Sequence, residues 1–536
     1  MSTYVRHTRP RAAYRVVATQ WRASRGVPNR LVYHQVAAAG NDTDAGACGL
    51  SHLRIENLAN ESPTVNCTTR LAVKDNIAAP GFPTTCASKI LTGTNIPFAA
   101  TIVSQLRSRG GMEVVSKAGM DEFGMGTHST TSAFEAIHNA SPREQYSAGG
   151  SSGGSAVAVK EGKADLALGT DTGGSVRMPA AYTGTVGFKP SYGMLSRWGV
   201  VPYANSLDTV GLLARTVRPI REAIVGLGLY AEQDPRDPTS LPESVRSRIT
   251  ADREGYTSTF TAGESLEGLT FGLPLEYNIQ ELDPRIRQGW LQALQTIQEL
   301  GGRVVPISLP STRNALSAYY VIAPAEASSN LAKYDGIRYG YRDTSGPSDA
   351  QDGVLYARTR GSGFGSEVKR RILLGSYTLS SEAIDNYFIQ AQKVRQLVRR
   401  DFDRIFKLEN PLLDEQHFPL SEMDESIGIE TKLGPAQVDF LVCPTAPTAP
   451  PLLEQIRNQT PLDSYMNDVF TVPASLAGLP AISIPMDIPV DPSSEEQKLL
   501  HFGGLQLVGQ YWDDARVLST AEMLSGHVSK TIGDNF

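Results

Sequence analysis

The sequence contains few of the side chains that build disulfide frameworks and metal sites. Its 536 residues include four widely spaced cysteines without a C-x-x-C pair, at Cys48, Cys67, Cys86 and Cys443. A disulfide scaffold, a zinc site and a redox pair are therefore not indicated. The eight histidines include no H-E-x-x-H pair, so the sequence gives no sign of metal catalysis.

Long apolar runs, strong positive charge and a P-loop are also missing. No run of about 18 apolar residues occurs, so we expect no membrane insertion. The formal net charge of −6 argues against a surface that mainly binds nucleic acid. Because no G-x-x-x-x-G-K-[ST] motif is present, a nucleotide-binding protein is a weak alternative.

The N-terminal region has no acidic residue before Asp42 and no lysine, but seven arginines. This composition is typical of an organellar transit peptide, which we expect over residues 1–36. The alternative is a disordered basic arm. Residues 37–69 are rich in Asn, Thr and Gly, show little periodicity, and are expected to form an irregular segment.

From Arg70 onward, short β-rich runs alternate with helical runs, without an internal repeat. The predicted elements are strands over 71–77, 165–169, 269–273, 303–305 and 438–444, and helices over 100–109, 155–161, 285–300 and 381–406. This alternation indicates an α/β fold whose central sheet is covered by helices on both faces. We expect one large domain over residues 70–536, with a polar surface insertion at 407–434.

Two glycine clusters, at residues 146–155 and 169–177, carry serines that lie 24 residues apart, Ser151 and Ser175. Dense glycine is typical of loops where a group approaches the main chain closely or where φ is positive. Backbone N–H groups freed in such turns bind anions. A serine that follows Thr172-Gly173-Gly174 would have an oxyanion hole beside it. We therefore expect a serine nucleophile here.

A serine nucleophile needs a base, and the candidates are histidine and lysine. His128 and His138 are the nearest upstream histidines, but no carboxylate at a recognisable spacing would orient them, so we interpret both as structural. The other candidate is Lys74, at the end of a predicted strand. It could act as a base only if burial lowered its pKa toward the operating pH, which costs about 4 kcal/mol.

Taken together, Val73-Lys-Asp-Asn-Ile77 and the two glycine clusters resemble the motifs of the amidase signature family. The resemblance implies a central mixed β-sheet and a Ser–cis-Ser–Lys triad, with Ser175 as nucleophile, Ser151 as bridging serine and Lys74 as base. It also implies an oxyanion hole made by the N–H groups of Thr172, Gly173 and Gly174.

Two neighbouring serines need a separate interpretation. We expect Ser152 and Ser155 to be a loop serine and a helix-capping serine rather than catalytic groups.

Within that family, the block from Glu326 to Arg371 is similar to the A subunits of tRNA-dependent amidotransferases, and stand-alone amidases generally lack it. The resemblance implies that Tyr320, Arg371 and Asp468 hold glutamine. A guanidinium suits the α-carboxylate, and a carboxylate suits the α-ammonium. The alternative for Arg371 and Asp468 is a structural ion pair.

The resemblance also implies partners and a location. We expect glutamine hydrolysis that supplies ammonia for converting Glu-tRNA(Gln) to Gln-tRNA(Gln), in the mitochondrial matrix. This chain would hold no cofactor and no metal, while ATP and Mg²⁺ would bind a B subunit, which would also make most contacts to the tRNA. A small third subunit, of C type or F type, would complete a heterotrimer. The alternative function is a stand-alone amidase acting on other primary or fatty amides.

Overall fold

The computed structural model describes residues 69–139, 146–258, 265–345, 355–413, 437–490 and 502–529. These residues all belong to one compact unit within residues 37–536. The predicted transit peptide, nearly all of the expected irregular segment, and residues 414–434 of the expected insertion lie outside the described residues.

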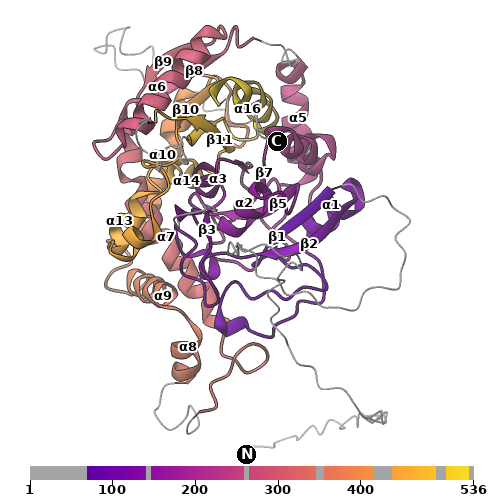
Figure 1. Ribbon diagram of the computed structural model, residues 1–536, viewed down its shortest axis with the longest axis vertical. Helices are drawn as coiled ribbons and strands as arrows, with labels where there is room; N and C mark the ends of the chain where they lie inside the picture. Colours follow the sequence, from indigo (N-terminus) through magenta and orange to yellow (C-terminus); the bar gives the residue numbers. More distant parts are fainter. Residues whose placement is uncertain are drawn as a thin grey trace, which may run out of the picture. The chain divides into compact units, whose positions relative to one another are not determined.

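The described residues form a mixed ten-stranded sheet (Figure 1). In spatial order its strands are β2 (Met112–Ala118), β1 (Thr69–Lys74), β5 (Leu166–Asp171), β7 (Thr209–Ala214), β6 (Val186–Lys189), β11 (Ala481–Asp487), β12 (Phe502–Val508), β10 (Phe440–Pro444), β8 (Thr270–Pro274) and β9 (Arg303–Ile307). The pairs on both flanks are parallel, and the pairs from β5 to β10 are antiparallel. A short second pair joins β3 (His138–Asn139) and β4 (Tyr146–Ser147). The predicted α/β fold with a mixed sheet is confirmed.

Helices cover both faces of the sheet, as successive residues of β12 demonstrate. A Cβ added to Gly503 would lie 2.7 Å from Ile286 of α6 (Pro284–Glu299), whereas one on Gly504 would meet Ala181 of α3 (Arg177–Thr183). Because successive strand residues point to opposite faces, α6 and α3 lie on opposite sides of the sheet.

Further α-helices occur along the whole of the described chain. They are α1 (Thr101–Gly110), α2 (Gly153–Lys160), α4 (Val217–Arg221), α5 (Glu243–Ser258), α7 (Ala315–Asn330), α8 (Ala357–Gly363), α9 (Ser366–Thr378), α10 (Phe388–Ile405), α12 (Leu453–Arg457), α13 (Pro461–Met466), α14 (Val472–Ala477) and α16 (Asp514–Val528). In the view of Figure 1, α8 and α9 lie at the opposite end of this unit from β8 and β9.

The helix predicted over 381–406 is too long, because α10 begins only at Phe388. Both α9 and α10 pack against α7, so the chain must reverse direction between them. Hydrogen bonds from the N–H groups of Ala383 and Ile384 to the Ser380 carbonyl form that turn. Tertiary packing, which local sequence does not encode, decides where this helix starts.

Candidate active site

Lys74 is the last residue of β1 and is fully buried. Because β1 runs parallel to β5, its end lies beside the start of the second glycine cluster. The Lys74 Nζ lies 2.7 Å from Ser151 Oγ, 2.8 Å from Ser152 Oγ and 2.9 Å from Thr170 Oγ1. Every neighbour is an uncharged oxygen, which suits a lysine that must release and accept a proton.

Burial lowers the pKa of Lys74 to about 7, because desolvation disfavours the ammonium. The carboxylates of Asp121, Asp171 and Asp208 act in the opposite direction but do not restore the ordinary value. Near neutral pH, a large fraction of this lysine is therefore unprotonated. That is the condition under which a lysine can act as a general base.

The first glycine loop presents Ser151 to the lysine. The Gly150–Ser151 peptide bond is cis, and the Ser151 carbonyl accepts a hydrogen bond from the Asp121 N–H at 3.3 Å. A Cβ on Gly150 would collide with the Asp121 carboxylate and lie 2.7 Å from the backbone nitrogen of His128. Only glycine fits at this close approach, which explains part of the glycine density in the sequence.

The structure corrects the interpretation of the neighbouring serines. Ser152 occupies the N-cap position of α2, but its side chain makes no capping hydrogen bond. Its hydroxyl instead contacts Lys74 as closely as Ser151 does and donates to the Thr170 carbonyl at 3.2 Å. Ser155 lies inside α2 and donates to the Leu168 carbonyl at 2.9 Å. Ser152 is therefore a direct neighbour of the candidate base.

Ser175 lies between β5 and α3 and is partly exposed. Its carbonyl accepts the Ser152 N–H at 3.0 Å, which joins the two glycine loops. Asp171 Oδ2 accepts the Val176 N–H at 3.2 Å, and the Asp171 carboxylate forms a fully buried ion pair with Arg177 at 2.8 Å. These contacts hold the loop from both ends.

The glycines before Ser175 let other side chains approach their backbone closely. A Cβ on Gly173 would lie 2.7 Å from the Tyr319 ring. One on Gly174 would clash with the Thr471 side chain and lie 3.4 Å from Asp468 Oδ1. The expected oxyanion-hole backbone of Thr172, Gly173 and Gly174 thus lies directly beside one of the expected substrate-binding residues.

The three expected substrate-binding residues come from separate segments. Tyr320 lies on α7, Arg371 on α9, and Asp468 just after α13. The Tyr320 hydroxyl donates to Asp468 Oδ2 at 2.8 Å, and the guanidinium carbon of Arg371 lies 5.4 Å from the centre of the Tyr320 ring. Tyr320 therefore brings the other two residues together.

Arg371 does not pair with Asp468, but the structural ion pair considered as an alternative is present for Arg371 with another partner. Arg371 instead forms an ion pair with Glu367 at 2.7 Å and donates to the Tyr203 hydroxyl at 2.7 Å. Tyr465 completes this cluster by donating to Glu367 Oε1 at 2.9 Å. The Arg371 guanidinium is thus buried in an ion pair with Glu367, and Asp468 is a second buried carboxyl group, held separately by Tyr320.

Sequence reasoning missed Tyr203, Glu367 and Tyr465. Glu367 stands four residues before Arg371, a spacing that places two side chains on the same helix face. Tyr465 stands three residues before Asp468, and its ring stacks on that of Tyr320 at 4.0 Å between centres. No comparable spacing signals Tyr203, which reaches Arg371 from a distant loop.

Burial also shifts the charged groups of this cluster. Desolvation raises the pKa of Asp468 to about 7, although the Tyr320 hydrogen bond and Arg371 lower it. Neighbouring acidic and phenolic groups hold the pKa of Arg371 above its ordinary range. An ammonium bound beside Asp468 would return its carboxyl to the ionised form.

His128 and His138, the two histidines considered as bases, do not belong to the group of candidate catalytic side chains. His128 bonds through Nδ1 to Ser147 Oγ at 2.9 Å and through Nε2 to the Asn467 side chain at 3.2 Å. Burial lowers its pKa to about 4. His138 belongs to the short strand β3. Neither contacts Lys74, Ser151 or Ser175 through a hydrogen bond in the described part of the chain.

Within the described ranges, no group of three or more His, Cys, Asp or Glu side chains is arranged to hold a metal ion. In the same ranges, no helix is both long and apolar enough to cross a membrane.

A buried lysine touching two serines, beside glycine loops and a partly exposed third serine, defines an amide-hydrolase type of site. The chain belongs to the amidase family, whose pattern matches residues 69–518.

Its relatives include fungal proteins named as the mitochondrial A subunit of glutamyl-tRNA(Gln) amidotransferase. The Podospora anserina protein is 61% identical over 463 residues, covering 85% of this chain and 89% of the relative. The Neurospora crassa protein is 59% identical over 499 residues, covering 86% and 91%.

The solved structure of the A subunit of glutamyl-tRNA(Gln) amidotransferase from Thermotoga maritima is also similar. Its TM-score is 0.63 and its identity 33%, covering 86% of this chain and 83% of that one. The family resemblance predicted from the motifs is confirmed.

Proposed function

We propose that this chain is the glutamine-hydrolysing A subunit of a mitochondrial glutamyl-tRNA(Gln) amidotransferase. The observation that carries the proposal is the place of the two buried charges. Asp468 lies beside Gly174, which belongs to the loop that carries Ser175. Arg371 lies on the other side of Tyr320, which contacts both Arg371 and Asp468. Together with relatives about 60% identical that carry this name, the site favours an α-amino acid amide as substrate.

In the proposed reaction, the Ser175 oxygen attacks the side-chain amide carbon of glutamine. The Ser175 proton passes to Ser151, whose own proton passes to neutral Lys74 over the 2.7 Å contact. The N–H groups of Thr172, Gly173 and Gly174 stabilise the oxyanion.

The intermediate collapses when Lys74 returns its proton through Ser151 to the leaving nitrogen. The carbon–nitrogen bond breaks, ammonia departs, and a γ-glutamyl ester remains on Ser175. Water then attacks the ester, its proton follows the same path to Lys74, and glutamate leaves as Ser175 regains its proton.

The α-carboxylate of glutamine binds Arg371, and the α-ammonium binds Asp468. Both contacts are made by charged groups in a buried site, where they are stronger than in water. An amide without these charges would forgo both contacts, and Arg371 and Asp468 would keep only their partners within the protein, so its binding would be weaker. This arrangement selects glutamine over simple alkyl amides.

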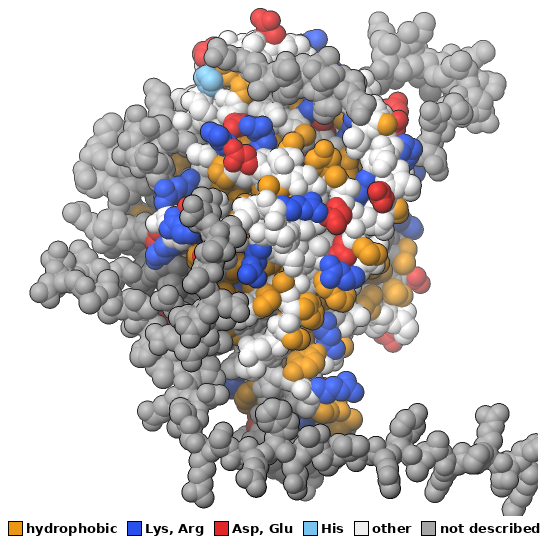
Figure 2. All heavy atoms as spheres, turned by 90° about the vertical axis from the view of Figure 1, so that its right-hand side faces the viewer, with side chains coloured by type: hydrophobic (Ala, Val, Ile, Leu, Met, Phe, Trp, Pro, Cys, Tyr) orange, Lys and Arg blue, Asp and Glu red, His pale blue; other side chains and the backbone are white. Residues whose placement is uncertain are grey.

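The remaining steps belong to partners. A B subunit would bind ATP and Mg²⁺, activate Glu-tRNA(Gln) and receive the ammonia, and a small C-type or F-type subunit would complete the heterotrimer. Over the described atoms of the face in Figure 2, both basic and acidic side chains occur. Residues 1–36 would direct the chain to the mitochondrial matrix.

The decisive experiment measures glutamate and ammonia released from glutamine by the purified chain, alone and with B and third subunits plus Glu-tRNA(Gln) and ATP. We expect glutamine hydrolysis that rises in the complex, and Gln-tRNA(Gln) only when the partners are present. Equal turnover of glutamine and an uncharged alkyl amide would favour the stand-alone amidase instead. Transamidation by this chain without partners would contradict the division of labour.

A further inference from the structure

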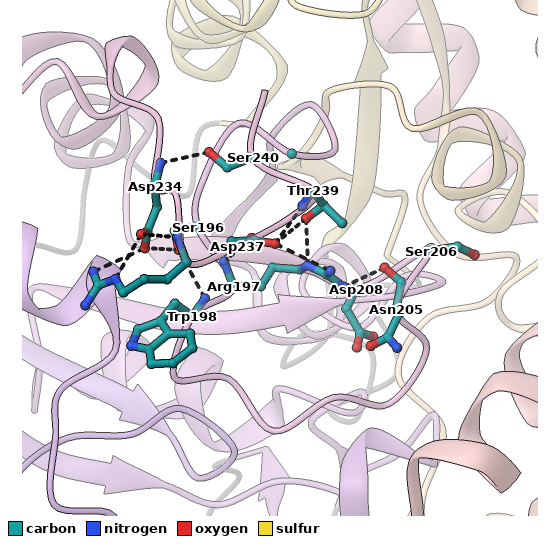
Figure 3. Close-up of polar contacts among 12 residues, drawn as sticks. Ser196, Arg197, Trp198, Asn205, Ser206, Asp208, Asp234, Asp237, Thr239 and Ser240 are labelled. Carbon is teal, nitrogen blue, oxygen red and sulfur yellow. Dashed lines mark hydrogen bonds and ion pairs between the residues drawn. The ribbon is translucent and has the colours of Figure 1, made fainter. Parts of the chain in front are cut away.

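Asp208 is a buried carboxylate that belongs to neither the catalytic groups nor the substrate-binding groups. It lies just before β7, is 5% exposed, and borders a cavity of about 520 Å³ lined also by Arg197, Trp198 and Asp237. Figure 3 shows its side chain beside Arg197 and Asn205.

Each oxygen of Asp208 serves a different part of the active site. Oδ1 accepts the Thr172 hydroxyl at 2.8 Å, and Thr172 is the first residue of the expected oxyanion loop. Oδ2 accepts the backbone N–H groups of Tyr203 at 2.8 Å and Ala204 at 3.0 Å. The Tyr203 hydroxyl in turn accepts a hydrogen bond from Arg371 at 2.7 Å. One carboxylate thus joins the oxyanion loop to the loop that supports the substrate-binding arginine.

Asp208 keeps both oxygens for these contacts because Arg197, the cation that lowers its pKa, is engaged elsewhere. Arg197 lies 3.6 Å from Asp237 and donates to Thr239 Oγ1 at 3.0 Å and to the Asn205 carbonyl at 2.5 Å, as Figure 3 shows. Among the described residues, Asp208 forms no direct ion pair. Burial raises its pKa, while Arg197 and the three hydrogen bonds lower it. A carboxylate is costly to bury unless its hydrogen bonds are all made.

We propose that Asp208 is a positioning residue that aligns the oxyanion loop, through Thr172, with the substrate-binding arginine, through Tyr203. The inference rests on the proposed glutamine hydrolysis and extends it. Its two oxygens separate the two effects: the Thr172 contact bears on kcat, since it places groups that stabilise the transition state, and the Tyr203 contact bears on KM.

The test compares Asp208→Asn, Asp208→Ala and Thr172→Val in the assembled complex. Asparagine can still accept the Tyr203 and Ala204 N–H groups with its oxygen, but its amide N–H₂ would have to donate to the Thr172 hydroxyl, which reverses the hydrogen bond and removes its charge assistance. We therefore expect Asp208→Asn to lower kcat by about tenfold with KM within about threefold, and Asp208→Ala to lower kcat and also raise KM.

Thr172→Val removes the same hydrogen bond from the other side and is the milder change if the Asp208 variants fold poorly. It should lower kcat by a similar factor. The Asp208→Asn, Thr172→Val double variant should be about as active as the poorer single variant, because both substitutions act on the same contact. A matched control is Asp234→Asn, which alters a nearby buried carboxylate that bonds Ser196 and Arg236 but forms no hydrogen bond or ion pair with Arg197 or Asp208 among the described residues. Its kcat and KM per folded molecule should match the unmutated chain.

Two results would overturn the proposal: a kcat within twofold of the unmutated chain in folded Asp208→Asn or in Thr172→Val, or multiplying effects in the double variant. Failure of the proposed function can be told apart from failure of the Asp208 proposal, because the unmutated complex itself would then not prefer glutamine. If that complex prefers an uncharged amide, the variants are measured on that amide, where the kcat effect should persist and the KM effect of Asp208→Ala should vanish.

Discussion

The nucleophile side and the substrate side of this site are built differently. On the nucleophile side, Lys74, Ser151 and Ser175 lie at strand ends and in glycine loops, where buried hydrogen bonds join the parts. On the substrate side, Arg371 lies on a helix whose other face is exposed at Leu373 and Tyr377. In the proposed mechanism, the catalytic groups are carried by the central sheet and its loops, whereas the substrate-binding groups are carried by segments packed onto the sheet.

Two adjacent residues connect the sides. Asp121 supports the Ser151 loop, and Glu122 accepts the N–H of Gly365, at the start of α9, at 2.8 Å. Burial raises the pKa of Glu122 to about 7. Apart from this link, the two sides belong to different elements. A change on the nucleophile side should reduce kcat, whereas a change on α9 should mainly reduce glutamine binding.

The largest effect is expected from removing the nucleophile or its base. Ser175→Ala and Lys74→Ala should each lower the rate of glutamine hydrolysis by several orders of magnitude. The first removes the attacking oxygen, and the second removes the group that accepts its proton. Far-UV circular dichroism and a thermal melt check that the fold survives. Hydrolysis near the unmutated rate in either folded variant would remove these residues from the mechanism.

The next effect concerns the substrate side. Arg371→Lys should raise KM for glutamine by about 10- to 100-fold and change kcat far less, since lysine keeps the charge but not the planar fork. Steady-state kinetics with glutamine measure the split, and an uncharged alkyl amide serves as the matched control, because its turnover should hardly change. A fall in kcat as large as that of Ser175→Ala would mean that the two sides are not separable.

The same division explains what the sequence could predict. Lys74 and the two glycine clusters lie in short continuous motifs, so the sequence predicts these residues directly. The alternation of strand and helix patterns likewise predicts the sheet covered by helices. The contact of Ser152 with Lys74 could not be predicted, because it depends on how the first loop turns against β1, which no local pattern reports. Tyr203 and Asp208 were missed as site residues for the same reason, since their partners lie far away in the sequence.

Ser152 provides a smaller test within the nucleophile side. Ser152→Ala removes one of the oxygens that contact Lys74 Nζ but leaves the Ser151 path intact. We expect kcat to fall by about tenfold with KM unchanged, because the ammonium that Lys74 becomes when it accepts the proton loses one hydrogen-bond acceptor. Ser155→Ala is the control, because within the described ranges the Ser155 hydroxyl donates to the Leu168 carbonyl and not to the catalytic groups, so its loss should affect stability rather than kcat. Equal kcat losses in the two variants would contradict a specific role for Ser152.

The smallest expected effect is a shift in the pH dependence of kcat/KM. It distinguishes the nucleophile side from the substrate side while glutamine hydrolysis continues. Lys74, with a pKa of about 7, must be neutral to accept a proton, and Asp468, with a pKa of about 7, must be ionised to bind the α-ammonium. Both conditions are met above pH 7 and lost as the pH falls. The kcat/KM value, which reports the free enzyme, should therefore drop on the acid side through two groups.

Tyr320→Phe distinguishes the two groups. Its hydroxyl donates to Asp468 and stabilises the ionised form, so removing it raises the pKa of Asp468. The acid limb of kcat/KM should move to higher pH, costing a few-fold at pH 7. The kcat profile should stay in place, because bound substrate keeps Asp468 ionised and only Lys74 titrates. A matching shift in the kcat profile would show that Tyr320 acts on the base, and the separation between the nucleophile side and the substrate side would fail.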